Sequence, residues 1–373
     1  MKSLTLPFVL FTLTLSLVTI GIISVYSASI SANYMLKQVG FAACGLLLML
    51  GGYQLDYNLL RRHALKLMLV ALALCLLVFI PHLGWANTRH AHRWVMLGPF
   101  RFQSSEFAKL AVVIYIAKML SDRRREIKNF FSGVLPAMIV TGLFAAIIVI
   151  EPDFGAAFTL CLTVFGMWFA AGMSGLHLAG LISFIIPAGV LAFRLQPYRV
   201  QRALAFAQYL FSPKTVDKEL VRGVLYQLIQ SLTAVGSGGL WGLGLGESHQ
   251  KYHYLSEPHS DFIFAIMCEE FGFVRVLGIL VLYAALILLG WRIAWRTTDL
   301  FGSLLASGIT LMFLSSAAIH MAVVLGLLPT KGLVLPFFSA GGSSLLVCMA
   351  AVGILMNIAR SQFAYHGVGW DGT

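Results

Sequence analysis

Charge is scarce in this chain, and the charge that is present is mostly positive. Only 11% of the 373 residues are charged while 59% are hydrophobic, against about 25% charged residues in a soluble domain. Lys and Arg number 26, but Asp and Glu only 15. This composition excludes an ordinary soluble enzyme. The basic residues are not gathered in one soluble domain, which argues against nucleic-acid binding.

Cysteine is also scarce and unpatterned. The five cysteines fall inside apolar runs, without the paired spacing of a disulfide framework or a metal site, and we interpret them as small buried side chains. His, Asp and Glu show no metal-ligand spacing either, so no protein-bound metal is expected. Coiled-coil, low-complexity and soluble segments are lacking too. Residues 1–373 are therefore expected to form a single integral-membrane domain.

Long apolar segments are abundant. Ten of them approach the length of about 20 residues that crosses a bilayer as a helix, which predicts an all-α polytopic membrane protein. The first has no convincing cleavage site and is interpreted as a retained helix. The segments cover about residues 7–29, 35–53, 64–82, 105–120, 131–150, 156–173, 176–194, 262–290, 300–325 and 341–359.

Basic residues in the short loops predict the orientation. If the N-terminus is inside, every short basic cluster falls on the same side, which is therefore cytoplasmic. Both termini are then cytoplasmic, and a long loop of about residues 195–261 between the seventh and eighth spans is extracytoplasmic. The clusters are Arg61-Arg62, then Lys118 with Arg123-Arg124-Arg125 and Lys128, then Arg292 with Arg296, and finally Arg360.

The long loop has features of an ordered segment. Apolar residues at three- and four-residue spacing predict an amphipathic helix over Leu220–Leu232, which would lie on the bilayer or on the bundle. The glycines between Gly236 and Gly246 are typical of tight turns or of a backbone that approaches a ligand closely.

One carboxylate stands where this loop meets the eighth span. Partly desolvated at the mouth of an apolar helix, Asp261 could gain basicity and act as a general base. Alternatively it caps the helix, because acids are favoured at helix N-termini. Glu106 and Lys109 are three residues apart inside the fourth span, so they share a helix face and can pair. Such intramembrane charges are either a structural ion pair or part of a functional site.

Several motifs occur in a fixed order along the chain. They are His92-Arg93-Trp94, Gln103 to Leu110, Glu151 to Gly155, Tyr226-Gln227, Gln230-Ser231, Gly236 to Gly239, Glu257 to Ala265, Pro329 to Gly332 and Gly341 to Ser344. On these motifs the whole chain resembles the SEDS family (shape, elongation, division and sporulation), and its Pro-Thr-Lys-Gly loop is most similar to the FtsW division branch. The departures from the family pattern are Ser256, Arg275, His320 and Ala340.

The resemblance implies a peptidoglycan glycosyltransferase of the bacterial cytoplasmic membrane. It would polymerise lipid II into glycan strands at the outer face during cell division. The implied partners are a class B penicillin-binding protein transpeptidase and other division-complex proteins, besides lipid II and the membrane lipids. The implied catalytic base is Asp261, and a single displacement with inversion needs only one such base. Any divalent cation would arrive with the substrate diphosphate.

Further residues are expected to bind substrate. They are Glu106, Lys109, Arg93, Arg101, Tyr198, Arg199, Arg202, Gln227, Ser231, Ser237, Lys251, Glu257, His259, Lys331 and Ser343. Guanidinium groups suit diphosphate oxygens, and Lys109 would face the diphosphate. For each basic residue, snorkelling beside lipid headgroups is the alternative. His259 could shuttle a proton or simply hold the loop.

Two other function classes fit parts of the pattern. A carrier that flips the lipid-linked precursor would also have ten helices with buried charges, and it would show internal repeats and a charged path at the midplane. A non-enzymatic scaffold that recruits cell-wall enzymes is the other alternative. No repeat relates the two halves, and the distinctive residues gather on one side of the membrane, which favours surface chemistry over transport.

Overall fold

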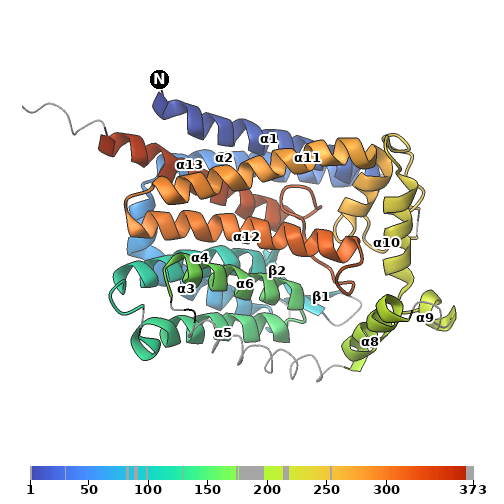
Figure 1. Cartoon of the computed structure of the whole chain (residues 1–373), viewed down its shortest axis with the longest axis horizontal. Coiled ribbons are helices and arrows are strands. Elements are labelled where there is room, and N and C mark those ends of the chain that lie inside the picture. The colour runs from blue at the N-terminus through green and yellow to red at the C-terminus, as the bar shows by residue number, and fades with distance from the viewer. Residues whose placement is uncertain are drawn as a thin grey trace, which may run out of the picture.

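Long apolar helices run side by side along one axis of the molecule in the computed structural model (Figure 1). The structure describes residues 2–29, 31–80, 84–87, 91–97, 100–127, 129–173, 175, 197–212, 218–252 and 254–366. The long helices are α1 Lys2–Ser29, α2 Ala32–Gln54, α3 Tyr57–Leu77, α4 Ser104–Asp122, α5 Leu135–Ile150, α6 Phe154–Ala170, α11 Ile263–Arg296, α12 Leu300–Val324 and α13 Gly342–His366. A π-helical turn, Phe130–Val134, leads into α5.

The expected membrane spans coincide with these helices, except for the span at 176–194, which lies outside the described residues. Within the described part of the chain, 6 helices are long and apolar enough to cross a membrane by themselves. The helices α3 and α4 fall short of this because each contains at least three charged residues, and α6 is shorter, with 17 residues. The prediction of an all-α polytopic membrane fold is confirmed.

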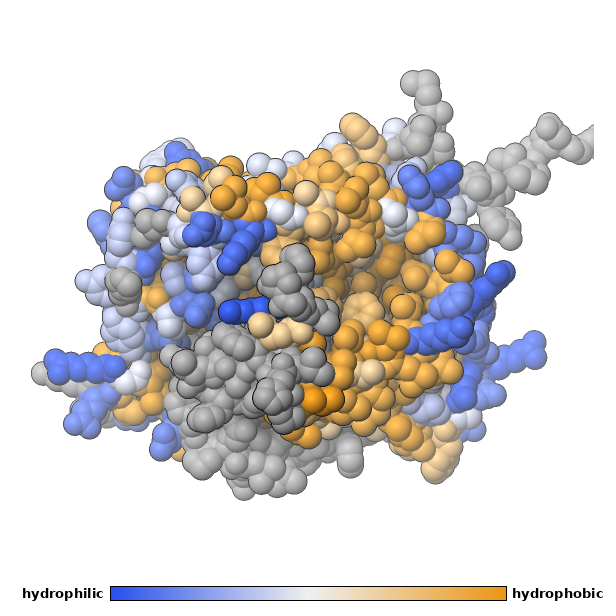
Figure 2. Space-filling view, turned by 180° about the vertical axis from the view of Figure 1, so that it is seen from behind, coloured by the Kyte–Doolittle hydropathy of each residue, from blue (hydrophilic) through white to orange (hydrophobic). Residues whose placement is uncertain are grey.

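The two ends of the bundle carry different segments. The N-terminus and the end of α13 lie at one end (left in Figure 1), whereas the helices of the long loop lie at the other. These are α8 Pro197–Phe211, α9 Lys218–Arg222 and α10 Tyr226–Ser237. In Figure 2 hydrophilic residues gather at both ends of the visible face, with a hydrophobic band between them. This is the pattern of a bundle whose middle faces lipid.

The prediction of a single amphipathic helix over Leu220–Leu232 was wrong. The chain forms α9 and α10 with a turn between them, in which the amide of Leu225 donates to the oxygen of Leu220 at 2.9 Å. Gly223 occupies this turn, and glycine is the residue that most weakens a helix interior apart from proline.

A small antiparallel sheet, which the sequence did not predict, precedes α4. Its strands are β1 Gly84–Asn87, β2 Ala91–Leu97 and β3 Phe100–Gln103, in the order β1-β2-β3. The last residue of β3 pairs with Trp94, and the next residue begins α4. The sheet therefore fixes the point at which the charged fourth helix starts.

The core of the bundle is closely packed. A Cβ on Gly353 of α13 would lie 2.3 Å from the oxygen of Met49 in α2, so these two helices are in backbone contact, as small residues permit in membranes. Many polar side chains inside the core bond to each other or to backbone. Thr163 and Ser315, for example, join α6 to α12 at 3.1 Å.

Candidate functional site

Asp261 lies in the turn just before α11 and is partly exposed. Its Oδ1 accepts a hydrogen bond from Ser260 Oγ at 3.3 Å, and its amide donates to the oxygen of Glu257 at 3.0 Å. The N-cap position of α11 is Phe262, without a side-chain capping bond. The geometry therefore does not support the alternative in which Asp261 is the helix cap.

The loop between α12 and α13 closes over the turn that carries Asp261. Ser339 Oγ donates to the oxygen of Ser260 at 2.7 Å, and the amide of Ala340 donates to the oxygen of His259 at 2.8 Å. A Cβ added to Gly332 would lie 2.5 Å from Asp261 Oδ2. The carboxylate thus lies directly against a backbone position that has no side chain.

Two residues that depart from the family pattern form hydrogen bonds in this region. His320 lies on α12, and its Nδ1 is 2.7 Å from the oxygen of Leu333, which ties the loop to the bundle. Ala340 contributes only its backbone amide, so the position does not depend on a larger side chain. On the other side, Arg202 of α8 donates from Nη1 to the oxygen of Thr330 at 3.0 Å.

Glu257 and His259 form a pair beside Asp261. Glu257 has a left-handed φ of 55°, and its Oε2 lies 3.4 Å from His259 Nε2. The imidazole ring also lies 4.5 Å from the ring of Tyr34. Burial lowers the pKa of His259, and the nearby Glu257 carboxylate partly opposes that shift. The ring is therefore held in its neutral form more strongly than a free histidine.

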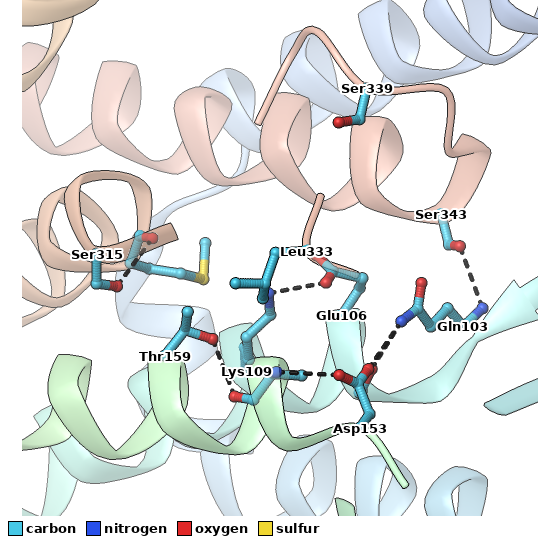
Figure 3. Close-up of polar contacts among 12 residues, drawn as sticks. Gln103, Glu106, Lys109, Asp153, Thr159, Ser315, Leu333, Ser339 and Ser343 are labelled. Carbon is cyan, nitrogen blue, oxygen red and sulfur yellow. Dashed lines mark hydrogen bonds and ion pairs between the residues drawn. The ribbon is translucent and has the colours of Figure 1, made fainter. Parts of the chain in front are cut away.

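A second acid, Asp153, organises the segments beneath the loop (Figure 3). Its Oδ2 accepts from Gln103 Nε2 at 3.1 Å and from Ser105 Oγ at 3.3 Å, while its Oδ1 caps α6 through the amide of Ala156. The amide of Gln103 donates to Ser343 Oγ at 3.1 Å. The sequence motif contained Asp153, but nothing in its spacing indicated this role.

Glu106 and Lys109 form the ion pair that their spacing predicted. Lys109 Nζ lies 2.8 Å from Glu106 Oε1 (Figure 3), and each side chain is 8% exposed. Both line a narrow pocket of about 10 Å³, which has room for about one water molecule. The other lining residues are Met312, Phe313, Ser316, Val334, Pro336, Ser344 and Cys348. Because Val334 and Pro336 belong to the loop over Asp261, the pair faces the underside of that loop.

Several predicted substrate-binding residues bond within the protein instead. Lys251 Nζ is 3.1 Å from Glu270 Oε1, and both side chains are nearly fully buried. Ser231 Oγ donates to the oxygen of Val324 at 2.8 Å. Ser237 Oγ is within 3.3 Å of Glu269 Oε1. The amide nitrogen of Gln227 donates to the hydroxyl of Ser256, another of the family departures.

The remaining residues expected to bind substrate lie on β2, β3, α8 and the loop between α12 and α13. Lys331 lies next to Gly332, with Nζ 5.5 Å from the ring centre of Phe154, and Arg101 is exposed on β3. Arg93 lies on β2, and Tyr198 and Arg199 lie in the first turn of α8. Among the described residues, no group of three or more His, Cys, Asp or Glu could hold a metal ion.

Comparisons with known proteins match nearly the whole chain. A model of the FtsW/RodA/SpoVE family, described as cell cycle protein, matches residues 6–363. A probable peptidoglycan glycosyltransferase FtsW of Trichlorobacter lovleyi is 39% identical over 360 residues, which cover 94% of this chain and 92% of that protein. The stage V sporulation protein E of Bacillus subtilis is 38% identical over 365 residues, covering 93% and 95%.

Two solved structures share the fold. A chain of a peptidoglycan synthase complex superposes with a TM-score of 0.77 at 27% identity, covering 95% of this chain and 97% of its own. The rod shape determining protein RodA of Thermus thermophilus superposes with a TM-score of 0.68 at 27% identity, covering 95% and 96%. With a family model matched along nearly its full length and relatives near 40% identity, this chain belongs to the FtsW/RodA/SpoVE family of cell cycle proteins.

Proposed function

We propose that Asp261 is the catalytic base of this peptidoglycan glycosyltransferase, and that its substrate is lipid II. The observation that carries the proposal is the placement of the carboxylate. It is partly exposed at the junction of a polar loop and a spanning helix, and it lies against Gly332 rather than capping α11. A base at that junction can meet a sugar whose lipid tail stays in the bilayer.

The chemistry needs one base and one leaving group. The acceptor hydroxyl attacks the anomeric carbon of the donor, Asp261 takes the hydroxyl proton, and the bond to the undecaprenyl diphosphate breaks with its electron pair on the diphosphate. One carboxylate is enough, because inversion in a single displacement needs no covalent intermediate. We assign the stabilisation of the departing diphosphate to Lys331, which is adjacent in sequence to Gly332, the residue that lies against Asp261.

The pocket beneath the loop supports a second part of the proposal. Glu106 and Lys109 line it together with residues of the loop that contacts Asp261. We assign Lys109 to the charged end of the substrate, with Glu106 keeping the ammonium oriented. Any divalent cation would enter with the diphosphate.

The membrane placement follows from charge. Short basic loops predict cytoplasmic termini, and the end of the bundle that carries the N-terminus and the end of α13 lies opposite the helices of the long loop. The site would then face the outside of the bacterial cytoplasmic membrane. Similarity to a chain of a peptidoglycan synthase complex supports a class B penicillin-binding protein as the partner, within a larger division complex.

The test is polymerisation of lipid II by the purified protein in proteoliposomes, with and without a candidate transpeptidase. Asp261→Asn should lower polymer yield by at least about 100-fold, the usual contribution of a general base. Glu247→Gln is the matched acid-to-amide control, because Glu247 is exposed in the same loop and should retain full yield. Unchanged yield with Asp261→Asn would sink the assignment.

One observation favours the alternative function, a carrier that flips lipid II. The helix α11 is broken at Gly272, and broken helices are typical of transporters. A flipping assay in the same proteoliposomes separates the two functions. If Asp261→Asn abolishes polymerisation while any lipid II movement is unchanged, the carboxylate serves chemistry. If both are lost together, the acid belongs to a transport path.

A further inference from the structure

The break in α11 is filled by another part of the chain. At Gly272 the backbone leaves the helix, with φ 72° and ψ 175°. Two amides beyond the break donate to the glycine-rich loop, Phe273 to the oxygen of Gly239 at 2.9 Å and Val274 to that of Leu240 at 3.1 Å. In return, the amides of Leu243 and Gly244 donate to the oxygens of Glu269 and Glu270 at 3.0 and 3.1 Å.

This segment, Gly239–Leu245, is called the inserted loop. Its contact with α11 is made by bare backbone. A Cβ on Gly272 would lie 2.1 Å from the nitrogen of Gly242, and one on Gly242, where φ is +78°, would lie 2.2 Å from the oxygen of Glu270. Non-helical backbone at a membrane surface requires such internal hydrogen bonds, because lipid supplies none.

The side chains of the inserted loop face outward and are apolar. Leu240, Trp241, Leu243 and Leu245 are between 41% and 67% exposed. The loop has no charged residue to keep these groups in water. An exposed apolar patch of this kind on a protein marks an interaction surface.

The patch continues a stripe on the spanning helix. Four of the exposed apolar residues of α11 that follow the break lie at helical spacing along one face, and they are Val274, Leu277, Val281 and Leu288. Val274 is also the residue whose amide bonds to Leu240. The exposed apolar face of α11, a helix long and apolar enough to cross a membrane, therefore continues onto the inserted loop. Acyl chains surround such a face on a spanning helix, so we take phospholipid as the occupant of the loop as well.

The depth of the loop follows from the length of α11. From exposed Arg292 near the opposite end back to Gly272 is about 20 residues, or about 30 Å of helix, the thickness of a hydrocarbon core. Gly272 thus falls at the boundary between acyl chains and headgroups. Exposed Arg275 lies one residue beyond Val274, within reach of headgroup phosphates.

We propose that the inserted loop is a membrane-interface anchor at the Asp261 end of the bundle, with its apolar side chains among the acyl chains and Arg275 on an anionic lipid headgroup. The anchor connects to the site through Glu269 and Glu270, which lie just before the break. Glu269 accepts from Ser248 Oγ at 2.5 Å, and Glu270 pairs with Lys251. The bilayer would then set the height of the loop that leads to Asp261. This proposal stands whether or not Asp261 is the base.

Trp241 provides a direct test. The fluorescence of Trp241 is obtained as the difference between the emission of wild type and that of Trp241→Phe. Each protein is purified without a partner and reconstituted in phospholipid vesicles. Bromine at carbons 6 and 7 of the acyl chain should quench this difference strongly, bromine at carbons 11 and 12 less, and aqueous acrylamide weakly. The matched control is Trp295→Phe, which removes an exposed tryptophan at the other end of α11 and should leave the Trp241 component unchanged.

Strong acrylamide quenching with no effect of either bromolipid would overturn the anchor. Protection from acrylamide that appears only when a partner protein is added would also overturn it, because the occupant would then be protein. Retained folding of Trp241→Phe is checked by its thermal midpoint, and Leu243→Trp in that background supplies a second reporter with the same expected order of quenching.

Arg275 is tested with brominated lipids of different headgroup. At equal mole fraction in neutral vesicles, brominated phosphatidylglycerol should quench Trp241 at least about twice as strongly as brominated phosphatidylcholine, because the arginine enriches the anionic lipid locally. Arg275→Gln should remove the difference and Arg275→Lys should keep it. Equal quenching by both lipids in the wild type would overturn the role of Arg275.

Discussion

Two buried ion pairs in this protein each join a lysine to a glutamate, but they differ in their surroundings. The pocket pair, Glu106–Lys109, is 8% exposed on each side and lines a pocket. The sealed pair, Lys251–Glu270, is 2% and 1% exposed, and it also binds the oxygen of Gly246 and the hydroxyl of Ser27. The difference shows that a buried charged side chain is a candidate for binding substrate only where it borders a pocket. The sealed pair connects α1, the segment that follows the inserted loop and α11, and we assign it to structure.

The largest effect should come from opening the sealed pair. Lys251→Met leaves the Glu270 carboxylate buried without its cation, which should cost about 3–5 kcal/mol of folding free energy. Loss of folded protein, measured by the thermal unfolding midpoint and by size-exclusion yield, is the readout. The double variant Lys251→Met/Glu270→Gln should recover much of that stability and retain polymerisation. Recovered folding without polymerisation would mean that this pair also serves the substrate.

The pocket pair should behave in the opposite way. Lys109→Met should reduce polymer formation by about 100-fold, the loss expected when one charge-stabilising group is removed. Adding Glu106→Gln should restore the unfolding midpoint, because no lone charge remains, while polymerisation stays low. A double variant that polymerises like wild type would place this pair with the structural one and remove Lys109 from the proposed site.

A smaller effect is expected where Asp261 meets the loop. Gly332→Ala would bring a Cβ to 2.5 Å from Asp261 Oδ2, so the carboxylate must shift, while the backbone of Gly332 is not left-handed and accepts alanine. Polymerisation should fall by about 10- to 100-fold, because catalysis is sensitive to displacements of about 1 Å. The unfolding midpoint should change little. Gly278→Ala, with open space around it, is the control and should be active.

The sequence predicted what depends on local pattern. Apolar length placed the spans, since a helix that crosses lipid carries its signal within about 20 residues. The spacing of Glu106 and Lys109 predicted their pair because helical neighbours three apart must meet. Motif order placed Asp261 in a loop before α11. These features needed no knowledge of tertiary contacts.

The sequence could not predict contacts between distant segments. Lys251 and Glu270 meet only because the inserted loop docks at the break in α11, so their ion pair had no signal in the sequence, and substrate binding by Lys251 stays a prediction. The bond from Gln103 to Asp153 likewise depends on how α4 and α6 pack. The strands before α4 are 4 and 7 residues long, and such short strands gain stability from pairing rather than from their own pattern.

The smallest predicted effect concerns His259, whose ring contacts the Glu257 carboxylate in the loop before α11. Burial lowers its pKa below the ordinary value of 6.5, so the unfolded chain binds a proton at a higher pH than the folded one. Stability is therefore complete above the unfolded value and declines as the pH falls through 6.5. The groups around the ring are the Glu257 carboxylate, which opposes the shift, and the aromatic ring of Tyr34. The unfolding midpoint of wild type should drop more between pH 7.5 and 5.5 than that of His259→Gln. An equal drop of the unfolding midpoint in the two proteins would show that the imidazole is not held neutral. His259 and Glu257 would then be a third ion pair, to be compared with the two buried ones.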